Sequence, residues 1–281
     1  MLDEKTQNEL IASGRRFTKA YSDIPEEIGD LFESDQQLRK PQPPLVKAPM
    51  TDGGHIKLTT DFSSLQLKND ILSVIRERRS ARVYTGEKMT LDELSFLLWA
   101  TQGVKDIRGN NYATLRTVPC GGARHEFETY LLVINIDGLA PGKYHYLPME
   151  HAIEFLGDVD DIGGAVDSTL CGQKWAATAN VIFYWTMVAY RAEWRYGIFA
   201  HRIAMIDVGH VGQNLYLGCT ALGIGTCGVG AFEDTECNKF FSLDGNEEYV
   251  VYTAPVGTVS PEDSAKEKAF YAFLDEDKTE E

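Results

Sequence analysis

The chain contains 281 residues, and its 27 lysines and arginines against 42 aspartates and glutamates give a formal charge of −15 at pH 7. This charge excludes a general nucleic-acid binder, because such proteins need a basic surface to displace counterions from phosphates. With 43% hydrophobic and 11% aromatic residues, the composition excludes a disordered chain, and the length allows one large domain or two small ones.

The first residues and the most apolar segment lack the usual signals for membrane insertion or export. The apolar run at 181–190 (VIFYWTMVAY) has ten residues, whereas a helix that spans a bilayer needs roughly 20. Asp3, Glu4 and Lys5 stand where a signal peptide would need an apolar stretch. We therefore expect a cytoplasmic protein with no membrane segment.

The cysteines and histidines show no metal-binding pattern. Five cysteines form an odd set without a CxxC pair, which suits a reducing compartment. His210 follows Asp207 by one helical turn, but no second histidine or acid has a coordinating spacing, so a hydrogen-bonded helix histidine is favoured. We expect no metal site and free thiols at Cys120, Cys171, Cys219, Cys227 and Cys237.

Composition separates the two ends of the chain from its middle. Five of the ten prolines fall in the first 49 residues and Gly53-Gly54 follows them, which predicts an extended arm over residues 1–60 that wraps a neighbour. The last 21 residues hold eight acids and three lysines. They predict an acidic tail over 261–281, in which residues 269–274 could dock as a short helix. A single domain over 61–260 lies between them.

Periodicity predicts an α+β fold for this middle part. Thr90 and Glu93 have the spacing of a capping box, which begins a helix at residue 91. A long helix ends at Leu222, with Gly223 as its left-handed terminal residue. Shorter helices are expected over about 159–171 and up to 241. Six strands are expected in a mixed sheet. Those at 128–136, 144–146 and 152–156 look like consecutive antiparallel strands, and the others lie at 181–188, 225–232 and 249–256.

The densest basic window is 76–82 (RERRSAR), with four arginines and one glutamate. Forked guanidinium groups and the Ser80 hydroxyl match the oxygens of a phosphate, so this window could bind an anion. The alternative is a solvated helix end whose arginines lie near the negative end of the helix dipole.

Two glycine-containing segments could let the backbone approach a ligand. The first is 119–124 (PCGGAR), for which a plain turn is the favoured explanation when the segment is taken by itself. The second is 222–232 (LGIGTCGVGAF), whose glycines lie in an expected strand and mark either a bulge or a ligand. It is not a dinucleotide fingerprint, because its glycines do not open a helix after a strand.

Together these segments resemble the nitroreductase family, specifically its SagB-type dehydrogenase branch, over about residues 70–258. The matching blocks occur in the family's order: RERRSAR, TLDELSFLLWATQGV, RTVPCGGARHEFETYLLVI, GLAPGKYHY, AMIDVGHVGQNLYLGCTALGIGTCGVGAF and VVYTAPVG. The resemblance implies a mainly antiparallel sheet flanked by helices, in an interlocked homodimer with FMN at the subunit interface. Residues 61–260 would then be the FMN-binding domain.

Three groups of residues match family positions that contact FMN. The first would hold its phosphate, ribityl chain and pyrimidine edge: Arg78, Arg79, Ser80 and Arg82. The second belongs to a loop that reaches the flavin from the partner protomer: Pro119, Cys120 and Gly121. The third would lie along the isoalloxazine, with the Gly230 amide donating to N5: Gly228, Val229, Gly230 and Ala231.

The chain departs from the family pattern at three places. Cys120 replaces the usual serine of the loop, and Thr258 stands where an arginine or lysine often completes the phosphate site. Arg195-Tyr196 aligns with the Lys-Tyr pair of azoline-oxidising members. An arginine stays protonated and cannot act as a general base. We therefore expect Arg195 to attract an anionic group and Tyr196 to donate a hydrogen bond to a reducible substrate.

The resemblance implies an FMN-dependent oxidoreductase that uses NAD(P)H to reduce a small electrophile, such as a nitroaromatic, a quinone or an activated alkene, by two-step hydride transfer. The first alternative is a SagB-type azoline dehydrogenase in the biosynthesis of modified peptides. The second is a flavin-binding protein without turnover.

Overall fold

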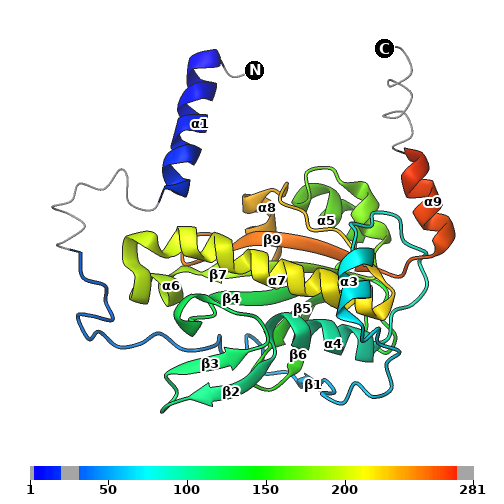
Figure 1. Cartoon of the computed structure of the whole chain (residues 1–281), viewed down its shortest axis with the longest axis horizontal. Helices are drawn as coiled ribbons and strands as arrows, with labels where there is room; N and C mark the ends of the chain where they lie inside the picture. The colour runs from blue at the N-terminus through cyan, green and yellow to red at the C-terminus, as the bar shows by residue number, and fades with distance from the viewer. Residues whose placement is uncertain (1–2, 20–31, 271–281) are drawn as a thin grey trace.

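A computed structural model describes residues 3–19 and 32–270 and has the α+β architecture expected from the sequence (Figure 1). Its main sheet has seven strands in the order β1-β6-β5-β4-β7-β9-β8, and all six pairings are antiparallel. The strands are β1 (Ile56–Lys57), β4 (Phe127–Val133), β5 (Gly142–Leu147), β6 (Ala152–Gly157), β7 (Val181–Val188), β8 (Gly225–Thr226) and β9 (Glu248–Gly257). A separate hairpin joins β2 (Val104–Arg108) to β3 (Ala113–Arg116).

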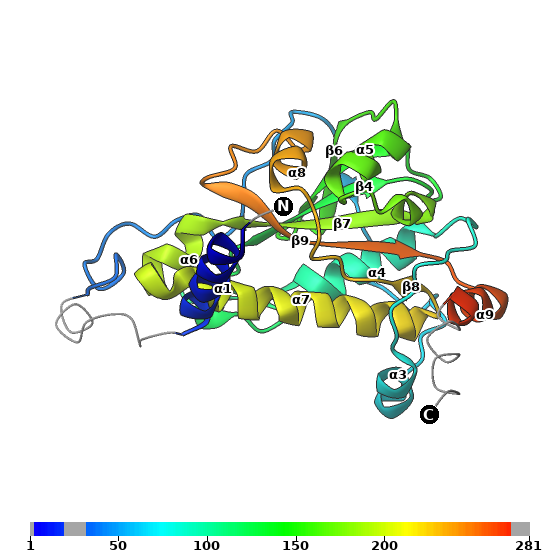
Figure 2. The same cartoon turned by 90° about the horizontal axis from the view of Figure 1, so that it is seen from above.

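Helices cover both faces of the sheet, as Figure 2 shows from above. Helices α4 (Leu91–Gln102) and α7 (Ala200–Leu222) lie on one face, whereas α5 (Ile162–Thr169) and α8 (Asp234–Phe240) lie on the other. Strand β7 supplies both cores, because Phe183 and Trp185 point to the first face and Ile182 and Tyr184 to the second. The other α-helices within the described ranges are α1 (Glu4–Thr18), α3 (Ile71–Glu77), α6 (Ala189–Tyr196) and α9 (Pro261–Phe270).

The local signals in the sequence form the expected structures. Thr90 and Glu93 make a reciprocal capping box at the start of α4. Gly223 ends α7 with φ at 77°, a backbone conformation that a glycine adopts without strain. Strand β7 has the predicted bounds. Within the described ranges, no helix has both the length and the apolar character needed to cross a bilayer.

The glycine-rich strand is shorter than the sequence suggests. Regular pairing with β9 covers only Gly225 and Thr226, and Val229 rejoins β9 through an isolated bridge to Thr253. The expected strand over 225–232 is therefore wrong beyond residue 226. Since residues 227–232 are not paired along their whole length, their backbone is available for other contacts.

The N-terminal arm also differs from its prediction. Its first part is not extended, because α1 is capped by the Asp3 side chain, which accepts a hydrogen bond from the Thr6 amide. Residues 20–31 lie outside the described ranges. The next residues pack on their own chain. The Gln36 amide donates a hydrogen bond to the Trp194 carbonyl, and the Lys40 carbonyl accepts one from the Trp194 indole.

The acidic tail begins as helix α9 (Pro261–Phe270). Most of the segment expected to dock as a short helix, residues 271–274, lies outside the described ranges.

A buried charge network crosses the centre of the sheet. His145, which is fully buried, places Nδ1 2.8 Å from Glu154 and Nε2 3.2 Å from Glu128. Arg191 forms an ion pair with the other oxygen of Glu128. Burial lowers the pKa of His145, but the two carboxylates outweigh this effect and raise it. The imidazole is therefore held as a cation between two anions.

The same carboxylates hold the arm to the sheet. Glu128 accepts a hydrogen bond from the Lys47 amide, and Glu154 accepts hydrogen bonds from the amides of Met50 and Thr51. Burial raises the pKa of Glu154, but His145 and these amides outweigh burial and lower it to about 2. Each charge thus has a partner, which is the condition for burying it without a large free-energy cost.

We predict that Glu154→Gln destabilises the protein at pH 7 and that its deficit shrinks as the pH falls. The depressed pKa means that the carboxylate stabilises the fold above its ordinary pKa near 4.5 and loses this effect towards pH 2. Urea unfolding of both proteins between pH 7 and pH 2.5 measures the difference. Glu150→Gln, which alters an exposed ion pair with Lys57, should have little effect. A deficit that is constant with pH would contradict the charged state of Glu154.

Candidate active site

The basic segment and the glycine-rich segment meet at one side chain, Tyr216 of α7. Helix α3 ends at Glu77, so the arginines that follow lie in an extended segment. The Arg78 guanidinium lies 5.3 Å from the centre of the Tyr216 ring, and Ser80 Oγ is 3.0 Å from the Tyr216 hydroxyl. The same hydroxyl accepts a hydrogen bond from the Gly228 amide at 2.7 Å. We call Arg78, Arg79, Ser80 and Arg82 the basic group.

Around the basic group, backbone and small side chains fit closely. The Ala81 amide donates to the Thr226 carbonyl, which aligns the basic segment with β8. Arg79 lines a cavity of about 140 Å³ together with Lys68, Thr220 and Gly225. Thr258 is directed elsewhere, because its hydroxyl contacts Thr85.

The three residues after Gly228 combine a fixed backbone with an open side. Val229 exchanges backbone hydrogen bonds with Thr253, and the Ala231 carbonyl accepts from Gln173. Gly230 is exposed, and a Cβ placed on it would meet no atom within 4 Å. Within the described residues, its amide donates no hydrogen bond. This amide is therefore positioned rigidly and is free to bind a ligand.

The second group forms where the PCGG loop contacts α6 and α7. The Gly121 amide donates to Asp207 Oδ2 at 2.7 Å. Gly122 has φ at 55°, and a Cβ there would collide with the side chains of Arg195 and Tyr196. We call this set the loop group: Pro119, Cys120, Gly121, Gly122, Arg195 and Tyr196. The structure thus brings together the loop and the Arg195-Tyr196 pair, which lie far apart in the sequence.

Arg195 has only neutral hydrogen-bond partners among the described residues. Its Nη1 donates to Gln36 Oε1 at 3.0 Å and to the Tyr112 hydroxyl at 3.1 Å. Its buried Nε has no hydrogen-bond partner among the described residues. The charge is therefore not neutralised by a paired carboxylate, which suits a role in attracting an anion. Sequence reasoning missed Gln36 and Tyr112, because their 159- and 83-residue separations from Arg195 leave no local signal.

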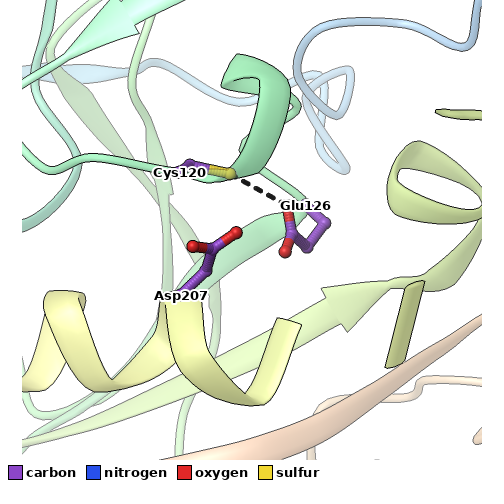
Figure 3. A group of neighbouring side chains, drawn as sticks. All are labelled: Cys120, Glu126 and Asp207. Carbon is purple, nitrogen blue, oxygen red and sulfur yellow. Dashed lines mark hydrogen bonds between the residues drawn. The ribbon is translucent and has the colours of Figure 1, made fainter. Parts of the chain in front are cut away.

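A thiol and two carboxylates converge behind the loop (Figure 3). Cys120 Sγ lies 3.1 Å from Glu126 Oε2, and one donor atom each of Cys120, Glu126 and Asp207 lie within 4.8 Å of one another. Burial, followed by the neighbouring charge of Glu126, raises the pKa of Cys120, and burial also raises the pKa of Glu126. His210 Nδ1 lies 3.6 Å from Asp207 Oδ1 at the exposed side. The sequence analysis did not identify Glu126 or assign a role to Asp207.

The basic group and the loop group contact opposite parts of α7. Asp207 and Tyr216 are nine positions apart, a distance of about 13 Å along the helix. Between them, the outer surface of α7 is exposed at Gly209 and His210, and Ile206 just before Asp207 is exposed as well. The sequence therefore identified both groups, whereas the structure shows that they are separate within one chain.

Comparisons with known proteins identify the family of the chain. The model of the nitroreductase family matches residues 75–258. A nitroreductase homologue of Methanocaldococcus jannaschii is 36% identical over 197 residues, which cover 70% of this chain and 93% of that protein. The trifolitoxin-processing protein TfxB of Rhizobium leguminosarum bv. trifolii is 28% identical over 49% of this chain, which spans 39% of TfxB.

Among solved structures, a chain of the Escherichia coli microcin synthetase McbBCD complex superposes with a TM-score of 0.58. The match has 18% identity and covers 92% of this chain and 95% of that one, so it shows a shared fold. From the family model, the archaeal relative and the arrangement of the sheet, we conclude that the chain belongs to the nitroreductase family of oxidoreductases.

Proposed function

We propose that the protein is an FMN-dependent oxidoreductase that takes hydride from NAD(P)H and reduces a small electrophile. The observation that carries this proposal is the convergence of the basic segment and the glycine-rich segment on Tyr216. The free thiols of the described cysteines support the cytoplasmic location that forms part of the proposal.

The donor set of the basic group fits the phosphate of FMN. Arg78 and Arg82 supply guanidinium donors and Ser80 a hydroxyl in a chain whose net charge otherwise repels anions. The open side of Gly230 and its unbonded amide fit the edge of a flat ring. FMN, when bound, supplies the two-electron chemistry, while the protein supplies binding, orientation and electrostatics. Arg82 would stabilise negative charge near the pyrimidine edge.

Arg195 and Tyr196 would act on the substrate. Gln36 and Tyr112 hold the Arg195 guanidinium in place beside the loop without neutralising it. Arg195 would therefore attract an anionic group of the substrate or the nicotinamide. Tyr196 would orient a reducible substrate by donating a hydrogen bond from its hydroxyl, which lies next to Gly122.

We further propose that two copies assemble a complete site. A two-fold axis midway between Asp207 and Tyr216 on antiparallel α7 helices would place the loop group of one copy beside the basic group of the other. Gly209 is exposed and has no side chain, so it would let two such helices approach each other closely. Exposed apolar side chains flank this surface: Ile71, Leu72 and Ile75 of α3, and Met205 and Ile206 of α7.

The purified protein is predicted to be yellow, with one FMN per chain, and to lose its colour on anaerobic addition of NADH or NADPH. Tyr196→Phe should leave this flavin reduction nearly unchanged and slow the reoxidation by a nitroaromatic or a quinone, because it removes only the hydroxyl. Stopped-flow absorbance separates the two half-reactions. A protein that binds no FMN, or whose bound FMN neither nicotinamide reduces, would contradict the proposal.

Gly230→Val should impair turnover much more than folding. The site is open within the chain, so a valine should change the free energy of unfolding only slightly, whereas it would occupy the space assigned to the flavin edge. FMN binding by fluorescence and the rate of reduction measure the first effect, and urea unfolding measures the second. Normal FMN affinity together with a normal rate of reduction would show that Gly230 does not face the cofactor.

Ile206→Glu should convert a dimer into a monomer and release FMN, because it places a charge among the apolar side chains that flank the proposed interface. Met149→Glu is the matched control, since Met149 is similarly exposed but lies in the turn between β5 and β6. Analytical ultracentrifugation with absorbance at the flavin band reports both properties. An active monomeric wild type would overturn the two-copy arrangement.

The likeness to TfxB, which is named as a trifolitoxin-processing protein, favours a second candidate function. In an azoline dehydrogenase, a base removes a carbon-bound proton while hydride passes to the flavin. Incubation of the purified protein with a thiazoline-containing peptide tests this directly by mass spectrometry. A loss of two hydrogen atoms, abolished in Tyr196→Phe, would favour the dehydrogenase over the reductase.

A further inference from the structure

We propose that Cys120, Glu126 and Asp207 form a binding site for a thiophilic divalent cation of the zinc class. The three side chains come from separate segments: the PCGG loop, the residue before β4, and the middle of α7. Figure 3 shows them turned toward a common point. This site does not depend on the proposed oxidoreductase activity.

Two acidic side chains are buried here without a directly paired lysine or arginine among the described residues, although the charge of Arg116 acts on Glu126 from a longer range. Glu126 is 1% exposed and Asp207 is 5% exposed. Neither carboxylate forms an ion pair with a lysine or an arginine of the described residues, and His210 reaches Asp207 only from the exposed side. Buried carboxylates are normally paired or coordinate a metal, so this pair lacks a counter-charge that a dication would supply.

An unpartnered oxygen indicates where the ligand binds. Glu126 Oε2 accepts a hydrogen bond from the Cys120 thiol, but Glu126 Oε1 is buried and finds no hydrogen-bond partner within residues 3–19 and 32–270. Zinc bonds of about 2.3 Å to sulfur and about 2.0–2.2 Å to oxygen place neighbouring donor atoms roughly 3 to 4 Å apart. The 3.1 Å separation of Cys120 Sγ and Glu126 Oε2 has this spacing.

Backbone groups orient two of the three ligands. The His125 amide donates to Cys120 Sγ at 3.1 Å, which orients the sulfur. The Gly121 amide donates to Asp207 Oδ2 and directs that carboxylate. Such contacts from the outer sphere are typical of metal sites. Cys120 itself is half-buried, so a cation has a route from the solvent.

The ligand set selects among cations. A thiolate favours zinc-class ions over Ca²⁺ and Mg²⁺, which prefer oxygen ligands in larger numbers. Binding exchanges the S–H bond for an S–Zn bond and releases one proton to the solvent, without oxidation or reduction. A bound ion would tie the PCGG loop to β4 and α7, which stabilises the loop.

The test is to titrate the purified full chain with Zn²⁺, remove excess ion by desalting, and measure the zinc retained. The expected result is one zinc per chain with an X-ray absorption spectrum that contains one sulfur neighbour. Cys120→Ser should remove the sulfur signal, and its affinity loss should exceed the roughly 10- to 100-fold typical of an outer-sphere partner. Glu126→Gln and Asp207→Asn, whose folding is checked by circular dichroism, should each weaken binding.

Cys171→Ser is the matched control, because Cys171 Sγ is also near a carboxylate, 3.7 Å from Glu233, but is exposed. It should retain the zinc and its sulfur neighbour. Retention of less than stoichiometric zinc by the wild type would overturn the site, and so would zinc lost in Cys171→Ser but kept in Cys120→Ser. An infrared band of a protonated carboxyl that persists with zinc present and disappears in Glu126→Gln would assign the charge balance to a proton instead. FMN content measured in the same samples shows separately whether the proposed function holds.

Discussion

Helix α7 is the element on which the rest of the structure depends, because its side chains hold the backbone of both candidate ligand-binding segments. Asp207 accepts a hydrogen bond from the Gly121 amide, and the Tyr216 hydroxyl accepts one from the Gly228 amide, each at 2.7 Å. Loss of either acceptor would leave a partly buried amide unsatisfied, which costs about 1–3 kcal/mol. The helix also lies close to the sheet, since a Cβ at Gly212 would come within 2.6 Å of the Tyr252 ring. The positions of both segments therefore depend on how closely one helix packs.

The buried carboxylates near the start of β4 have two different kinds of surroundings. Glu128 and Glu154 are surrounded by His145, Arg191 and the amides of the arm, so their charges are balanced within the chain. Glu126, two residues before Glu128, has a thiol at one oxygen and, in the described part of the chain, no hydrogen-bond partner at the other. The first arrangement fastens the N-terminal arm to the sheet. The second leaves a carboxylate to be balanced from outside, and this contrast between Glu126 and its neighbours in β4 and β6 is the basis for the proposed cation site.

Cys120 links the two proposals, because the loop that resembles a flavin-contacting segment also carries the proposed cation ligand. The backbone of this loop and the Cys120 side chain face different neighbours, since the Gly121 amide is directed to α7 and the Cys120 thiol to Glu126. The proposed FMN contact of the loop and the proposed cation contact of the thiol would therefore use different atoms. Family membership gives the fold and the class of chemistry, whereas in our proposal the substrate would be selected by side chains such as Arg195 and Tyr196.

Elements with a contiguous signature in the sequence were predictable from the residues alone: the capping box of Thr90, the apolar run of strand β7, and the end of α7 at Gly223. The arginines and glycines of the candidate site were recognisable for the same reason, because each motif is contiguous. Helix α1 was missed because the prolines that follow it dominated the composition of the arm. The partners Tyr216, Glu126 and Gln36 were also missed. Their contacts join segments that lie far apart in the chain, and these segments meet only because the order of the strands and the packing of α7 bring them together.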